Sequence, residues 1–150
     1  MAENNLFPAF NVPAMLTDEP EQNIVKYKKS WFFDYETGDF VKDGGNRVKE
    51  CDGWTAWTQW CMKTVRTIRY ACLAYDGDMG IEDEDVRRQP TRKAAESAFE
   101  RTITEALLAD PRTESVRNFS FDWKGDILHA SFDVFPRIGA SVTLQAEIKV

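Results

Sequence analysis

The sequence has no long hydrophobic run and no leader-like N-terminus. No stretch of its 150 residues approaches the ~18 consecutive apolar residues that a membrane-spanning helix requires. Residues 1–10 contain neither the basic region nor the apolar region of a signal peptide. We therefore expect a protein that does not associate with membranes and that stays in the compartment where it is made.

Cysteine is sparse, and its arrangement favours neither disulfides nor metal binding. The chain has 3 cysteines, Cys51, Cys61 and Cys72, and no C-x-x-C motif. An odd number of cysteines cannot all pair within one chain, and two of these lie in apolar helical or strand segments. We expect buried, reduced thiols, no bound metal and no cofactor.

The common catalytic motifs are also missing. The single histidine, His129, falls on the polar face of an expected central strand, and no G-x-S-x-G, H-E-x-x-H or phosphate-binding loop occurs. A nucleophilic pair of His129 with one of the cysteines stays open as an alternative. Paired carboxylates occur in any acidic chain, so they do not by themselves indicate a glycosidase. We expect a protein that is not an enzyme.

Positive charge is in deficit. The formal net charge is -6, which opposes binding to nucleic acid and to anionic lipid, because both need clustered cations. Apolar residues make up 43% of the chain and aromatic residues 13%, enough to form a core in a single domain of this length. The expected partners are therefore other proteins, with no nucleic acid and no membrane among them.

The first 27 residues predict an extended arm rather than part of the domain. Pro8, Pro13 and Pro20 interrupt any helix there, and the apolar residues among them have no period. Their aromatic content favours an arm that lies along a partner over one that is solvated. The predicted organisation is an arm at 1–27 and one domain at 28–150.

Two helices and a small hairpin are expected in the first two thirds of the domain. Strand formers on both sides of the turn at 36–39 predict a hairpin within 29–42. A helix begins near Asp52, with Trp54, Trp57, Cys61, Val65 and Ile68 on its apolar face. Residues 70–75 fit a last helical turn or a short strand, and 76–90 a loop. A second helix spans about 91–109 and ends at Asp110-Pro111.

The acidic loop and its basic neighbours allow two interpretations each. Asp76 and Asp78 begin an EF-hand pattern, but Ile81 replaces the required glycine and Arg87 stands where the bidentate Glu belongs. A solvated loop is the favoured interpretation. Its acids are expected to face Arg87, Arg88, Arg92 and Lys93, with an acidic patch on another protein as the alternative.

Three tryptophans recur every third residue in the first helix. Trp54 and Trp57 fall on the apolar stripe and predict core packing, whereas Trp60 lies at its edge and is the better candidate for contact with a partner. A stacking platform for bases or sugars is the alternative.

The C-terminal third predicts an antiparallel meander. Period-2 alternation recurs in 119–123, 128–134 and 142–150, with a tight turn at 124–126 and Pro136 and Gly139 before the last strand. The fold class is therefore α+β, with two main helices packed on a C-terminal β-meander, an N-terminal hairpin and an extended arm.

Four blocks, in this order, resemble the baseplate wedge, or sheath-initiator, family of contractile phage tails, in its XkdS-like branch. They lie at 33–41, at 67–70, at 75–82 and at 105–121. One departure is Asp110-Pro111-Arg112, where the wider family often carries Glu before Pro-Arg. The resemblance covers roughly residues 29–135 and does not include the arm.

The resemblance implies a structural role. Such proteins join the baseplate wedge and tail tube to the first sheath ring and seed the sheath by β-strand addition, which needs an open sheet edge. The implied partners are the tail sheath protein, other wedge proteins and tail-tube proteins, in multiple copies of a six-fold baseplate. The implied location is a phage tail or related particle, after assembly in the bacterial host cytoplasm.

The interface residues expected on this basis lie in three places along the chain. They are Arg69, Tyr70, Tyr75, Gly80, Glu82, Asp110, Pro111, Arg112, Val142, Leu144 and Ile148. A stand-alone interaction or regulatory module of the same fold is the alternative function. A lysozyme-like activity, sometimes attached to wedge relatives by analogy, has no support in these residues.

Overall fold

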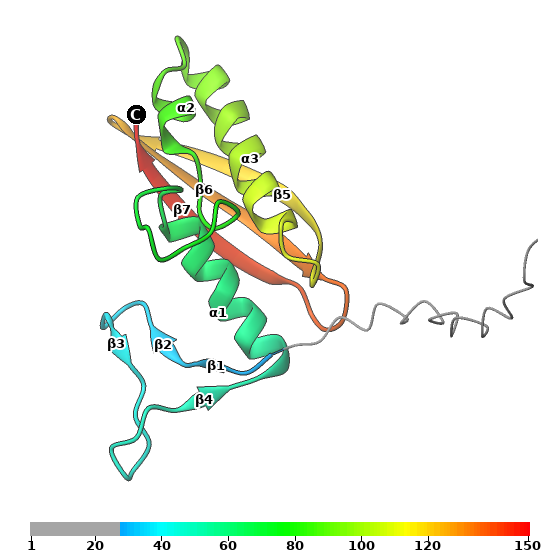
Figure 1. Cartoon of the computed structure of the whole chain (residues 1–150). Helices are drawn as coiled ribbons and strands as arrows, with labels where there is room; N and C mark the ends of the chain where they lie inside the picture. Colours follow the sequence, from blue (N-terminus) through cyan, green and yellow to red (C-terminus); the bar gives the residue numbers. More distant parts are fainter. Residues whose placement is uncertain (1–27) are drawn as a thin grey trace, which may run out of the picture.

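A computed structural model describes residues 28–150 of the chain. The arm expected at 1–27 lies outside the described residues. The described part combines three α-helices with three small β-sheets, so the predicted α+β class is confirmed. Figure 1 shows helices α1 and α3 lying across one face of the largest sheet.

Two short strand pairs precede the first helix. In the predicted hairpin, β2 (Phe33–Asp34) pairs with β3 (Asp39–Phe40). The residues before it take a different partner, because β1 (Ser30–Trp31) pairs with β4 (Glu50–Cys51). The hairpin prediction is therefore confirmed at its turn, and the second pairing was not anticipated.

Helix α1 (Gly53–Arg66) starts after Asp52, as predicted, and ends before Ile68. Trp57, Cys61 and Val65 are buried on its inner face. The prediction of a buried position was wrong for two residues of the expected apolar stripe. Ile68 lies beyond the helix and is 46% exposed, and Trp54 is 39% exposed, with its indole N–H donating to the carbonyl of Ala140 at 2.6 Å.

The expected loop at 76–90 contains a helix that the sequence did not reveal, α2 (Asp83–Arg87). Arg87 and Arg88 pair with acids one turn earlier, Asp83 and Glu84, at 2.7 Å each, as expected. The solvated-loop interpretation was wrong at this point, because the pairs form within the helix and Asp83 is buried. Arg92 was placed wrongly. It lies 4.9 Å from the ring of Trp123 and donates to the carbonyl of Gly125 instead of facing the acids.

Helix α3 (Arg92–Leu108) agrees closely with the second predicted helix. The hydroxyl of Thr91 caps its N-terminus by accepting the N–H of Ala94 at 3.2 Å. The predicted stripe is buried, from Ala95 through Phe99 and Ile103 to Leu107. Tertiary packing of this stripe, more than local propensity, holds such a helix in place.

The C-terminal meander forms a sheet in the order β5-β6-β7, antiparallel throughout. Its strands are β5 (Thr113–Lys124), β6 (Ile127–Pro136) and β7 (Val142–Lys149). Strand β5 begins earlier than the alternation predicted, because its first half contains register shifts, with Asn118 at a φ of 59°. Such bulges break the period-2 signal.

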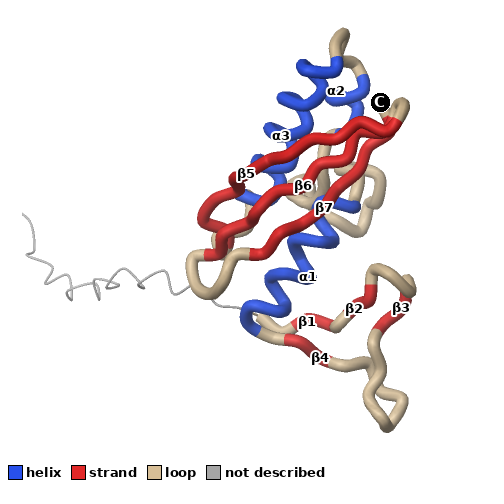
Figure 2. The backbone as a smooth tube through the Cα atoms, turned by 180° about the vertical axis from the view of Figure 1, so that it is seen from behind, coloured by secondary structure: helices blue, strands red, loops and turns tan. Residues whose placement is uncertain are grey.

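The core lies between the helices and one face of this sheet. Phe132, Leu128 and Val134 on β6 pack with Trp57 of α1 and Phe99 of α3. The opposite face carries mainly polar residues, such as Asp122, His129 and Glu147. No described helix covers it (Figure 2). This one-sided burial explains the alternation read from the sequence.

The cysteine and tryptophan predictions hold in part. Cys51 and Cys61 are buried and free, whereas Cys72 is free but exposed, contrary to the expectation of three buried thiols. It lies at 68–75, which forms bends and turns that are neither helix nor strand, so its apolar sequence does not bring burial. Trp60 packs against the core, 5.8 Å from the guanidinium of Arg112.

Candidate functional site

The loop between α1 and α2 is fixed at its base. Ile68 and Ile81 form a short parallel bridge, in which the N–H of Arg69 donates to the carbonyl of Ile81 at 2.9 Å. The side chain of Arg69 donates to the carbonyl of Gly80 at 3.1 Å and to the carboxylate of Glu82 at 3.0 Å. Three of the predicted interface residues, Arg69, Gly80 and Glu82, therefore form one cluster.

Gly80 is the residue that permits this approach. Its φ is +99°, and a Cβ atom there would lie 2.7 Å from the carbonyl oxygen of Thr67 and 2.9 Å from the nitrogen of Arg69. Both neighbours are backbone atoms and cannot move aside cheaply. Any side chain at this position would therefore push apart the base of the loop.

The tip of the same loop presents apolar side chains to solvent. Tyr70, with a φ of 65°, is 73% exposed, and Leu73 is fully exposed. Tyr75 is better held, because the ammonium of Lys63 lies 4.4 Å from its ring centre. Tyr70 and Tyr75, both predicted interface residues, thus lie on a surface that the described chain leaves open.

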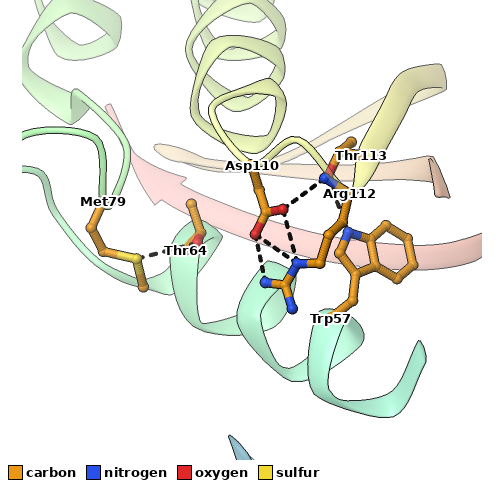
Figure 3. A network of polar contacts seen from close by, with 6 residues as sticks. All are labelled: Trp57, Thr64, Met79, Asp110, Arg112 and Thr113. Atoms are coloured by element: carbon orange, nitrogen blue, oxygen red, sulfur yellow. Dashed lines mark hydrogen bonds and ion pairs between the residues drawn. The ribbon is translucent and has the colours of Figure 1, made fainter. Parts of the chain in front are cut away.

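Asp110 and Arg112 form a nearly buried ion pair between α3 and β5 (Figure 3). The guanidinium of Arg112 reaches both carboxylate oxygens of Asp110, at 2.5 to 3.0 Å, and the backbone N–H of Arg112 donates to one of them. Pro111, between them, is exposed. These three predicted interface residues are consecutive in the chain and are separate in sequence from the loop cluster.

Strand β7 lies at an edge of the sheet, with β6 as its neighbour on one side. The side chains of Leu144 and Ile148, expected at an interface, are buried in the core, and Val142 is half-buried against it. Their neighbours in sequence, by contrast, point to the open face. Pairing of a partner strand with β7 therefore depends on which N–H and C=O groups of β7 point away from β6.

The pairing pattern identifies those backbone groups. Val150 donates its N–H to the carbonyl of Asp126 at 2.9 Å, one position beyond the pair of Lys149 with Ile127. Hydrogen-bonded and non-hydrogen-bonded pairs alternate in antiparallel sheets, so every second residue of β7 directs its N–H and C=O away from β6. These residues are Thr143, Gln145, Glu147 and Lys149.

A groove of about 760 Å³ lies beside this free edge and extends across the open face as far as Asp122 on β5. On the inner face it is lined by Val65, Ile68, Ile81 and Ala146, and on the open face by residues that include Glu147. Because its lining comes from both faces of β7, the groove passes around the strand's edge. The outward backbone groups of β7 therefore lie in a depression that the end of α1 and the start of α2 help to enclose.

The open face beside the edge carries a row of titratable side chains. Asp122, His129 and Glu147 lie in register across the three strands, and Nδ1 of His129 is 3.4 Å from the carboxylate of Glu147. Four residues further along β6, at Asp133, the hydroxyl of Thr143 and then the amide of Asn118 donate to the carboxylate and lower the pKa of this group. These contacts order the face, and Asp122, His129 and Glu147 also line the groove.

Candidate centres for chemistry are few in the part of the chain that the structure describes. Within 28–150, no group of three or more His, Cys, Asp or Glu side chains is placed to hold a metal ion. Burial raises the pKa of the Cys61 thiol far above its usual value, so this thiol stays protonated. No helix in 28–150 is long and apolar enough to cross a membrane.

Comparison with known protein families identifies the chain as a component of a contractile injection system. The chain belongs to the contractile injection system sheath initiator family, whose model matches residues 29–137. It is therefore a sheath initiator, with a structural role at the baseplate.

A curated relative supports the same assignment. The chain is 29% identical over 118 residues to the phage-like element PBSX protein XkdS of Bacillus subtilis (strain 168). The similarity covers 77% of this chain and 79% of that protein. The resemblance to an XkdS-like branch of the family, seen in the order of four sequence blocks, is thereby confirmed.

Sequence reasoning proposed the last strand because it has few charges to hinder pairing, but it named residues on the core side of that strand. Leu144 and Ile148 are buried in the core, and Val142 packs against it. Gln145 and Glu147, whose backbone groups point outward, were missed. The alternation of apolar and polar residues in 142–150 contained the information needed to find them. In an edge strand, the residues between the buried ones direct their side chains to the other face, and their backbone N–H and C=O groups point the opposite way from those of the buried residues.

Proposed function

We propose that the free edge of β7 seeds the sheath by accepting a β-strand from the first ring of tail sheath protein. Membership of the sheath initiator family supplies the context. The observation that carries the proposal is the row of outward backbone groups on Gln145 and its neighbours, exposed in a groove along the edge. Edge strands of this kind pair readily with another chain unless they are blocked.

Nothing in the described chain blocks this edge. No backbone hydrogen bond from another described segment reaches Thr143, Gln145, Glu147 or Lys149, and β7 contains neither proline nor a bulge. Strand addition supplies affinity through main-chain hydrogen bonds, and the side chains at alternate positions supply specificity. The proposed attachment is thus a sheet that continues from the baseplate into the sheath.

The remaining exposed surfaces suit other baseplate partners. The loop tip with Tyr70 and Leu73 offers apolar contact area to a wedge or tail-tube protein. Asp110 and Arg112, which satisfy each other, would act by shaping the start of β5 rather than by direct pairing. The proposal therefore assigns sheath contact to the edge of β7 and wedge contact to the tip of the loop between α1 and α2, whose base at Ile68 and Ile81 lines the same groove.

A proline substitution tests the sheath contact with little damage to the fold. Gln145→Pro removes an N–H that points outward, so the ladder between β6 and β7 keeps its hydrogen bonds. We expect tail tubes without sheath when particles from producing cells are viewed by negative-stain microscopy. The matched control, Gln145→Thr, keeps the N–H and the β propensity and should leave sheathed tails normal.

The melting temperature of each purified variant separates assembly from folding. A Gln145→Pro protein that melts within a few degrees of the parent and still supports normal sheaths contradicts the proposal. Loss of sheath in the threonine variant as well would assign the effect to the side chain rather than to the backbone.

A further inference from the structure

The inner wall of the edge groove contains a hollow. Phe121, Ala130 and Ala146 form one row across the sheet, and the rows on either side carry larger residues at the edge, Leu144 and Ile148. Two adjacent alanines therefore leave space beside the free edge of β7. Both line the groove, opposite Val65, Ile68 and Ile81.

The side of the hollow opposite the sheet is apolar and partly exposed to solvent. Ile68 is 46% exposed, although the bridge to Ile81 fixes its position at the groove. A side chain on an added strand, placed beside Ala146, would point to the inner face because side chains in register share a face. It would fill the space above Ala146 and cover Ile68.

The open-face side of the groove is charged, and along β7 an acidic residue, Glu147, is followed by a basic one, Lys149. Glu147 has His129 beside it on β6, while its other flank faces the free edge, and its side chain is 71% exposed. Lys149, the next residue on this face, lies in a row with Lys124 at the far strand. Opposite charges directly across strands stabilise pairing, and like charges oppose it.

We propose that this groove selects a strand with a large apolar side chain beside Ala146, a basic side chain beside Glu147 and an acidic one beside Lys149. The inference rests on the proposed strand addition and adds the side chains that decide which strand is accepted. The occupant is a segment of a partner protein with alternating pattern, large apolar residues on one face and charged residues on the other. The hollow fixes its register, and the charges fix its direction.

Synthetic strand peptides probe this selectivity directly. Three ten-residue peptides share one alternating frame: one has a central Phe with the predicted charges, one has Ala at the centre, and one has the charges exchanged. Binding to the full chain is followed by NMR chemical-shift changes of the backbone amides of β7. We expect the Ala peptide to bind about tenfold more weakly, as befits loss of an aromatic ring from an apolar groove.

Two variants of the protein make the complementary changes. Ala146→Phe fills the hollow from within and should abolish the preference for the Phe peptide. Glu147→Lys, at a side chain that is 71% exposed, should favour the charge-exchanged peptide over the original one. Glu114→Ala, at an exposed position of β5 away from the groove, serves as the neutral control and should change neither preference.

The outcomes separate this inference from the proposed function. Equal binding of all three peptides along β7 overturns the selectivity while strand addition stands. Binding of none, with sheath assembly still lost in Gln145→Pro, overturns the selectivity and leaves the proposed function intact. Binding that appears only after residues 1–27 are removed would overturn the partner assignment, because the chain's own N-terminal segment would then be the occupant.

Discussion

Trp57 donates its indole N–H to the hydroxyl of Thr113 at 3.1 Å, which ties the middle of α1 to the first residue of β5 (Figure 3). Both side chains are buried. The bond crosses the core between elements distant in sequence, and it satisfies a donor that water cannot reach. This contact holds the helix layer in register with the sheet whose edge is the proposed attachment site.

Thr113→Val tests this link with a side chain of the same shape. The buried indole N–H is then left without an acceptor, which we expect to lower the free energy of unfolding by about 1–3 kcal/mol. Chemical denaturation followed by tryptophan fluorescence measures the change. The control is Thr58→Val, whose hydroxyl bonds only to the carbonyl one turn earlier in α1 and should matter little.

Gly80→Ala should destabilise the base of the loop. The added Cβ meets the backbone of Thr67 and Arg69 at less than 3 Å, and the φ of +99° is unfavourable for alanine. We expect a loss of about 1–3 kcal/mol, measured as a fall in melting temperature. Gly77→Ala, where the nearest atom would lie 3.6 Å away, is the matched control. Equal effects of both substitutions would contradict the account of the loop.

Asp110→Asn should cost more than the loss of any surface ion pair. The carboxylate is nearly buried against Arg112, and neutralising it removes the charge from one side of this buried ion pair. We expect a loss near the lower end of the range for broken buried pairs, about 3 kcal/mol, because Arg112 keeps its contact with Trp60. Arg88→Ala breaks an exposed pair and should change stability by no more than about 0.5 kcal/mol.

Thr143→Val should change the pH dependence of the edge strand. The hydroxyl of Thr143, followed by the amide of Asn118, lowers the pKa of Asp133 in the folded protein. This contribution to stability is present above the unfolded pKa and is lost as the pH falls below about 4, through the folded value. The pKa of Asp133, read from its carboxyl carbon by NMR, should rise toward normal in the variant. An unchanged value would contradict the assigned cause.

The elements with a strong period were predictable from sequence. The residues of α3 repeat at helical spacing and those of β6 alternate without interruption, so pattern and structure agree. Helix α2 has only five residues, too few for a period to appear. The strands β1 and β4 have two residues each and are separated by residues 32–49 of the chain. No pattern of neighbouring residues could therefore predict that they pair.

From the sequence, the last strand could be proposed as the candidate site, but the residues of that strand that face a partner could not. Which backbone groups of β7 point outward depends on its register with β6, and register is a property of the folded sheet. The hollow beside Ala146 depends in the same way on its placement next to Ala130. The exposure of Cys72 depends on a loop path that no periodicity describes.

The most direct test of the central claim is a cryo-electron microscopy reconstruction of the baseplate end of an intact tail that contains this protein. The account predicts that the sheet β5-β6-β7 gains a further strand from the sheath protein, hydrogen-bonded to Gln145 and Glu147 along the free edge of β7. A sheath ring that contacts other surfaces while this edge stays open to solvent would contradict it.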